Sequence, residues 1–186
     1  MRLSTPRLVL RDFTEGDLSR ELTVPPGPRP EALQPFDLRD VPGLRRQMRE
    51  AIATSREEPR TAWDLAVVVK DGERLIGRAG LRLSEREPKE ALVWFVSDPS
   101  SWNQGYANEA LTALLGACFG ELNLHRVTAE CSPDNAGAVG LFEALGLRRE
   151  AHFVENANEG GRWVDTAVFA MLAREWKARA KPVTSG

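Results

Sequence analysis

The sequence has 186 residues, of which 42% are hydrophobic and 28% charged, as is typical of a globular domain with its own core. The formal net charge of −2 gives no electrostatic reason to expect nucleic acid or an anionic membrane as a partner. Arg45, Arg46 and Arg49 form a local basic cluster, but Asp40 and Glu50 lie among them. The cluster therefore favours a solvated helix face over an RNA-binding patch.

Cysteine and histidine usage bears on the compartment and on metal chemistry. The chain has two cysteines, no apolar N-terminal run and no stretch of roughly 20 apolar residues, so we expect a cytoplasmic protein with reduced thiols. His125 and His152 stand far apart and match no ligand spacing, so we expect no metal site. His125 is expected to be buried and hydrogen-bonded on a strand face, with a catalytic role as the alternative.

The first half of the chain predicts a strand, two helices and a three-stranded meander. Residues 24–35 carry five prolines and predict a surface loop. A helix is expected to start near Asp40, with Pro42 in its first turn. Its expected apolar stripe is Leu44, Met48, Ala51 and Ile52. The expected strands are residues 7–11, 63–70, 75–83 and 91–96, with a turn at Asp71-Gly72 and a bend or bulge at Gly77 and Gly80.

The second half opens with the clearest helix of the sequence. Apolar residues recur at three- and four-residue spacing from Ala107 to Leu122. After it come an alternating strand at 126–131, a helix capped by Asn135 and ended by Gly146, two strands around a turn at 158–161, and a helix at 172–180.

These elements predict an α+β fold in a single domain over residues 1–186, with residues 179–186 as a disordered tail. The sheet is expected to be mixed, mostly antiparallel, with about six to seven strands and helices on both faces. Strand, long helix and strand imply one parallel crossover, whose binding crevice lies at the carboxyl ends of the strands.

The turn that opens the long helix falls at this place. The first N–H groups of a helix have no intrahelical partner, and the helix dipole adds partial positive charge there. Gly105 removes a Cβ where an anion would pass, and Ala107 keeps the first turn slim. The turn therefore predicts an anion site, although an ordinary glycine turn is the alternative.

The residues of this turn also carry a resemblance. Asn103-Gln-Gly-Tyr-Ala-Asn-Glu-Ala110, preceded by Pro99 and Trp102, resembles the acetyl-CoA signature of the GNAT acetyltransferases. More narrowly, the chain is similar to the branch related to ribosomal-protein N-terminal acetyltransferases. The further landmarks are the segments 5–11, 124–129, 145–147, 161–165 and 175–176, together with Asn135.

The resemblance implies a GNAT-like fold, acetyl-CoA as cosubstrate and an amine as acceptor. Pyrophosphate would bind backbone N–H groups of residues 103 to 107, and the thioester and pantetheine would align near Phe95 and Val96. The implied cofactor-binding residues are Phe95, Val96, Trp102, Asn103, Gln104, Gly105, Tyr106, Ala107, Asn108 and Asn135. Trp102 stands where the family has Arg or Gln, and Asn103 where the branch usually has Gly. If Asn103 needs a positive φ, it is the next best residue after glycine.

Catalytic roles are harder to assign than the cofactor loop. Glu90 is the candidate general base, with a solvated carboxylate at the strand end as the alternative. Glu109 in the first helical turn is explained by a favourable interaction with the helix dipole. The tyrosine and serine that the family offers as proton donors to the thiolate correspond to Phe142 and Ala138.

Asn135 is expected to cap a helix and, by resemblance, to lie beside the cofactor. Gly137 and Gly140 disfavour this helix, so they indicate either close approach of a ligand or backbone, or packing. Trp163 is expected at the core rim or in the acceptor cleft.

We therefore predict an acetyl-CoA-dependent N-acetyltransferase that acts by direct transfer on a primary amine of a small molecule or a protein N-terminus, as a monomer or homodimer. The alternative is a CoA-binding module with little catalysis that acts as a sensor or partner-binding subunit.

Overall fold

The computed structural model describes residues 1–19, 41–159 and 161–179. The strands are β1 (Arg2–Ser4), β2 (Leu8–Asp12), β3 (Ala62–Val69), β4 (Arg74–Leu83), β5 (Glu90–Ser97), β6 (Arg126–Cys131), β7 (Arg148–Glu159) and β8 (Arg162–Leu172). The helices are α1 (Glu15–Ser19), α2 (Val41–Thr54), α3 (Tyr106–Phe119), α4 (Ala136–Ala144) and α5 (Ala173–Arg179), with short 3-10 turns η1 (Asp71–Glu73) and η2 (Pro99–Ser101).

Two sequence predictions fall partly or wholly outside these residues. The proline-rich loop at 24–35 lies outside them, as does the expected tail from residue 180 onward. Arg179, which was expected to begin that tail, is the last residue of α5.

The described residues form two compact units. The first contains Met1–Arg82 and Trp94–Leu114, and the second contains Leu83–Val93 and Leu115–Gly186. Strand β5 and helix α3 therefore each contribute to both units. The prediction of a single domain stays a prediction.

The sheet is mostly antiparallel, as the sequence predicts. The first unit has the order β1-β2-β3-β4 and continues into the C-terminal half of β5, and the second runs from the N-terminal half of β5 through β6 and β8 to β7. Strands β5 and β6 pair in parallel, with Glu90 opposite Arg126, which confirms the predicted crossover through α3. The sheet has eight strands rather than six to seven. The additional strand, β1, has three residues, of which only Leu3 is buried, so it is too short to show alternation.

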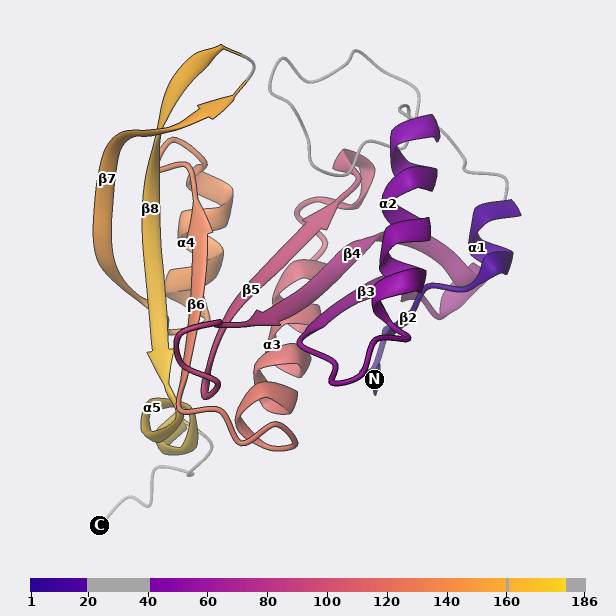
Figure 1. Cartoon of the computed structure of the whole chain (residues 1–186), viewed down its shortest axis with the longest axis horizontal. Helices are drawn as coiled ribbons and strands as arrows, with labels where there is room; N and C mark the ends of the chain where they lie inside the picture. The colour runs from indigo at the N-terminus through magenta and orange to yellow at the C-terminus, as the bar shows by residue number, and fades with distance from the viewer. Residues whose placement is uncertain (20–40, 160, 180–186) are drawn as a thin grey trace. The chain divides into compact units, whose positions relative to one another are not determined.

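The core of the first unit lies between α2 and the sheet (Figure 1). The predicted stripe of α2, from Leu44 to Ile52, packs with Ala66 and Val68 of β3 and Leu75 of β4. Leu65 and Val67 point to the other side of β3 and are also fully buried. Both faces of this strand are thus covered, and for this reason its sequence from Leu65 to Val69 is continuously apolar.

In the second unit, α4 packs on the strands β6 and β8 (Figure 1). Phe142 of α4 lies with its ring centroid 5.4 Å from that of Phe169 of β8. Gly146 has φ +79° and follows the C-cap residue Leu145, so it ends helix α4 as the sequence predicts. Helix α3 ends at Phe119, earlier than the apolar period suggests, and the chain then turns through Gly120 and Asn123, which has φ +48°.

Candidate functional site

The predicted anion site begins with a turn that is firmly fixed at the end of β5. Asp98 is buried, and its backbone N–H donates to the Ile76 carbonyl at 2.9 Å. Its carboxylate accepts a hydrogen bond from the Ser100 backbone N–H at 2.9 Å and so caps η2. The chain therefore leaves the sheet in a defined direction.

The loop from Trp102 to Gly105 contains two residues in the left-handed region. Asn103 has φ +58° and Gly105 has φ +77°. Asparagine and glycine are the residues that adopt this conformation at least cost, so the expectation for Asn103 is confirmed. Trp102 is exposed, and its indole Nε1 donates to the Ser97 carbonyl at 3.3 Å.

Free N–H groups line this loop. Within the part of the chain that the structure describes, no group accepts a hydrogen bond from the backbone N–H groups of residues 103–108. The first bond of the helix runs from Glu109 to the Gly105 carbonyl at 3.1 Å. Residues 102–105 are exposed, and the following helix has 14 residues, enough for a dipole directed at the loop. The arrangement can hold an anion with several oxygen atoms.

The segment between β1 and β2 contacts this loop, which sequence reasoning missed. The Glu109 carboxylate accepts hydrogen bonds from Thr5 Oγ1, from the Arg7 backbone N–H at 2.8 Å and from Arg7 Nε at 2.6 Å. Burial raises the pKa of Glu109, but the bonds from Thr5 and Arg7 outweigh it and hold the pKa below its ordinary value. Helix dipole alone therefore does not account for Glu109. Thr5 and Arg7 belong to the opening landmark of the branch, but that pattern does not say what they touch.

Phe95 and Val96 lie in the C-terminal half of β5 and are half-buried. Val96 packs on the core under α2. A Cβ at Gly77 of β4 would lie only 2.3 Å from the Val96 carbonyl oxygen, and the register of β3 against β4 shifts at this place. Of the predicted bend or bulge, the structure shows a bulge at a close backbone approach, which only glycine permits.

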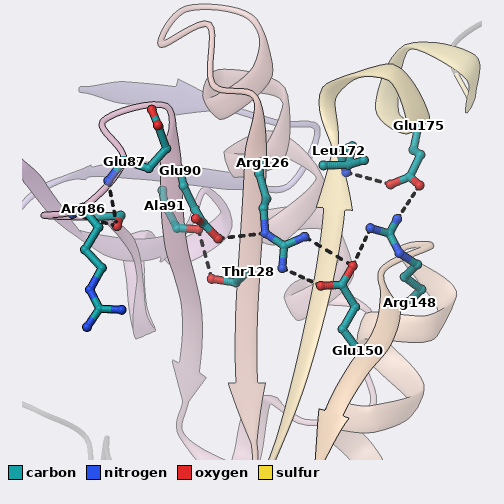
Figure 2. A network of polar contacts seen from close by, with 11 residues as sticks. Arg86, Glu87, Glu90, Ala91, Arg126, Thr128, Arg148, Glu150, Leu172 and Glu175 are labelled. Atoms are coloured by element: carbon teal, nitrogen blue, oxygen red, sulfur yellow. Dashed lines mark hydrogen bonds and ion pairs between the residues drawn. The ribbon is translucent and has the colours of Figure 1, made fainter.

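Glu90 belongs to the second unit and is part of a line of alternating charges (Figure 2). Its Oε1 accepts from Arg126 Nε at 2.8 Å. Arg126 also pairs with Glu150, and Arg148 pairs with both Glu150 and Glu175. The hydrogen bonds from Arg126, then Arg148, keep the pKa of Glu150 below its ordinary value. Because one oxygen of Glu90 is engaged by a guanidinium, any proton transfer to that oxygen competes with the ion pair.

Asn135 caps α4, as predicted. Its Oδ1 accepts from the Ala138 backbone N–H at 3.0 Å. A Cβ built at Gly140 would have no other part of the described chain within 4 Å, and one built at Gly137 would meet only Asn135 Oδ1 at 3.5 Å. Close packing therefore does not explain these glycines. Among the described residues, the space beside the first turns of α4 is open.

The side chains at the two expected proton-donor positions have no hydroxyl group. Phe142 is buried and packs on Phe169, so the position serves the core of the second unit. Ala138 donates its backbone N–H to the Asn135 cap.

The structure corrects the expectation for His125, which is exposed. Strand β6 begins one residue later, and the backbone of His125 is held at the strand entry by bonds to Lys89 and Ala173. The alternation of β6 therefore does not include this side chain. Trp163 is 60% exposed on β8, and Cys118 is fully buried, which raises the pKa of its thiol to about 12.

Among the described residues, no group of three or more His, Cys, Asp or Glu side chains is arranged to hold a metal ion. In the same residues no helix is both long and apolar enough to cross a membrane.

A family model described as acetyltransferase (GNAT) domain matches residues 7–148, which include the loop from Trp102 to Gly105 at the start of α3 and Asn135, the cap of α4. The chain belongs to the GNAT acetyltransferase family. Its elements from β2 to α4 are thus those of a GNAT domain, and the resemblance to the GNAT family seen in the sequence is confirmed.

Individual proteins agree with this assignment. The chain is 36% identical to the uncharacterized N-acetyltransferase YnaD of Bacillus subtilis over 110 residues, which are 59% of this chain and 64% of YnaD. It is 28% identical to spermidine N(1)-acetyltransferase of Vibrio cholerae over 115 residues, 61% of this chain and 66% of that protein. The chain thus spans less than two thirds of YnaD. A GNAT-family acetyltransferase structure from Bacillus anthracis superposes with a TM-score of 0.74 at 23% identity, covering 94% of this chain and 100% of that one, which shows the shared fold.

Proposed function

We propose that this GNAT protein is an acetyl-CoA-dependent N-acetyltransferase that moves an acetyl group to a primary amine by direct transfer. The observation that carries the proposal is the run of backbone N–H groups at residues 103–108, which find no acceptor among the described residues and are shaped by two left-handed residues before a 14-residue helix. This arrangement fits a pyrophosphate, because its oxygens accept several hydrogen bonds at once and its charge is favoured at the helix start.

Acetyl-CoA supplies the acetyl group as a reactive thioester. The backbone of Trp102, Asn103, Gln104, Gly105, Tyr106, Ala107 and Asn108 would hold the pyrophosphate. Phe95 and Val96 would align the pantetheine, and a backbone N–H of this strand would stabilise the charge that develops on the thioester oxygen. Asn135 would lie beside the cofactor, and the open space at Gly137 and Gly140 supports close approach of a ligand to α4.

The acceptor ammonium must lose a proton before it can attack. Glu90 is the proposed base, through a water, and its ion pair with Arg126 is the observation against it. With Phe142 in the core and no hydroxyl at Ala138, we propose that solvent returns a proton to the leaving thiolate.

Two acceptor classes remain in the proposal. The match to spermidine N(1)-acetyltransferase supports a polyamine or another small-molecule amine. The branch landmarks from Thr5 onward support a protein N-terminus. A thiol-release assay over polyamines, small amines and peptides with free N-termini distinguishes these classes. Light scattering of the purified chain tests the proposal of a monomer or homodimer.

The second candidate is a CoA-binding module with little catalysis. It is favoured by the missing hydroxyls at residues 138 and 142 and by the engaged Glu90. Calorimetry with acetyl-CoA tests both candidates together. A Kd above about 1 mM, which is a binding free energy weaker than about −4 kcal/mol, would contradict both. Tight binding with no thiol release over the whole acceptor panel would favour the module.

A further inference from the structure

The short segment Thr5–Arg7 joins β1 to β2 and lies against the start of α3. One guanidinium, that of Arg7, reaches three parts of the loop and helix. Arg7 Nη1 donates to the Gln104 carbonyl at 2.8 Å, and Arg7 Nε donates to Glu109 at 2.6 Å. The guanidinium carbon also lies 4.7 Å from the ring centroid of Tyr106. Arg7 thus contacts residues within and directly after the run 103–108, whose backbone N–H groups have no acceptor in the described part of the chain.

The bond to the Gln104 carbonyl has a direct consequence for the proposed site. The peptide group is planar and trans, so the carbonyl of Gln104 and the N–H of Gly105 point in opposite directions. By holding the carbonyl, Arg7 turns the Gly105 N–H away from itself. Arg7 therefore sets the direction of a donor in the middle of the free run.

The loop needs such an outside support. Asn103 and Gly105 are both in the left-handed region, and for a non-glycine residue this conformation costs roughly 1–2 kcal/mol. Among the described residues, two side-chain bonds tie the turn to the residues before it: Gln104 Nε2 donates to the Ser100 carbonyl at 2.7 Å and Trp102 Nε1 to the Ser97 carbonyl at 3.3 Å. The segment Thr5–Arg7 adds support from the other side, at the Gln104 carbonyl and at Glu109.

That segment is itself anchored to the sheet. The Thr5 backbone N–H donates to the Leu8 carbonyl at 3.0 Å, and the Leu8 N–H donates to Thr5 Oγ1 at 2.8 Å. The Lys70 N–H donates to the Arg7 carbonyl at 2.9 Å, and the Lys70 ammonium binds the Thr5 carbonyl. Glu109 completes the arrangement, since its carboxylate joins Thr5 and Arg7 to the first turn of α3.

We propose that Arg7 and Glu109 are positioning residues for acetyl-CoA: they hold the loop 103–108 with its N–H groups directed at the cofactor pyrophosphate. The inference rests on the proposed function and deepens it. Arg7 acts here through its forked geometry, because Nε, Nη1 and the face of the guanidinium each engage a different group of the loop and helix. A lysine keeps the charge but cannot reproduce the fork.

The test compares the affinities of two probes that differ in the phosphates. Acetyl-CoA binding is measured by calorimetry, and binding of S-acetylpantetheine, which has the acyl arm without phosphates, by chemical-shift titration of ¹⁵N-labelled protein. The variants are Arg7→Lys and Glu109→Gln. The control is Arg11→Lys, which removes a similar fork, to Asp17, from the adjacent strand β2. Thermal unfolding of each variant shows that it is folded.

We expect Arg7→Lys and Glu109→Gln to weaken acetyl-CoA binding about 10-fold, the value of one hydrogen bond to a charged group. Their affinity for S-acetylpantetheine should stay that of the wild type. The chemical-shift change of the Gly105 amide on adding acetyl-CoA should be smaller than in the wild type. Arg11→Lys should lower the unfolding midpoint and leave acetyl-CoA affinity within about 2-fold.

Three results would overturn the inference. The first is wild-type acetyl-CoA affinity in both variants. The second is an equal loss for both probes, which would mean that the contacts only support the fold. The third is full affinity in Arg7→Lys with loss in Glu109→Gln alone, which would mean that charge rather than fork geometry matters. Failure of the proposed function is separate, because the wild type itself would then not bind acetyl-CoA.

Discussion

Replacing Gly105 by valine tests whether the loop before α3 binds the cofactor or is only a turn. Gly105 has φ +77°, a conformation that costs a non-glycine residue roughly 1–2 kcal/mol and a β-branched residue more. The new Cβ would lie 3.2 Å from Arg7 Nη2, the far end of a flexible side chain that can yield. The change in folding stability therefore comes mainly from the backbone.

Gly72 provides the matched control. It lies in the same unit, has φ +69°, and a Cβ built there meets nothing within 4 Å. We expect Gly72→Val and Gly105→Val to lose similar stability, roughly 1–2 kcal/mol or somewhat more, in urea unfolding. Only Gly105→Val should lose acetyl-CoA affinity. If one or two hydrogen bonds to phosphate oxygens are misdirected, at about 1.5–3 kcal/mol each, the loss is at least about 10-fold.

Calorimetry with acetyl-CoA at a temperature well below both unfolding midpoints measures this difference. Wild-type affinity in both Gly105→Val and Gly72→Val would refute the reasoning, because the turn would then be merely structural. A loss of affinity in both variants would show that strain anywhere in the first unit is enough, and the loop would then have no special role.

Three further changes test other parts of the molecule. If Glu90 is the base, Glu90→Gln lowers the acetylation rate by about 10²-fold or more, while a rate close to that of the wild type removes it from that role. Burial raises the pKa of Asp17, but hydrogen bonds from Arg11 and Thr14 outweigh it and lower the pKa overall. Its stabilising effect is therefore present above the unfolded-state pKa, about 3.9, and is lost as the pH falls through the lower folded-state value. Asp17→Asn should flatten the fall of the unfolding midpoint below about pH 4, and an unchanged acid profile contradicts this. Because burial raises the pKa of the Cys118 thiol to about 12, this thiol should stay unlabelled by a maleimide at pH 8 in the native protein and react after unfolding, as read by mass spectrometry.

Local features of the fold could be predicted from the sequence because neighbouring residues determine them. The stripe from Leu44 to Ile52 is buried in α2, and Asn103 has the positive φ expected of it. Asn135 caps α4 and Gly146 follows its end, since caps depend on one or two residues and the backbone next to them. The loop proposed to bind the cofactor also belongs to this class, because its signature is contiguous.

Other features depend on which strands become neighbours and in which register. Glu109 is more than 100 residues from Thr5 and Arg7, and nothing local to either segment indicates that they touch. His125 was expected inside a strand, but its strand begins one residue later, so the predicted face was wrong. Glu90 has Arg126 as its partner only because β5 and β6 pair in parallel with these two residues opposite each other.

Contiguous motifs in the sequence indicate the GNAT family by resemblance. The α+β class, the parallel crossover and the loop from Trp102 to Asn108 follow from periodicity and turn chemistry, which depend on residues close together in the chain. Only the tertiary structure decided what supports that loop and what engages the candidate base. Strand pairing and burial place Arg7 against the Gln104 carbonyl and Arg126 against Glu90, and these are properties of the folded chain as a whole.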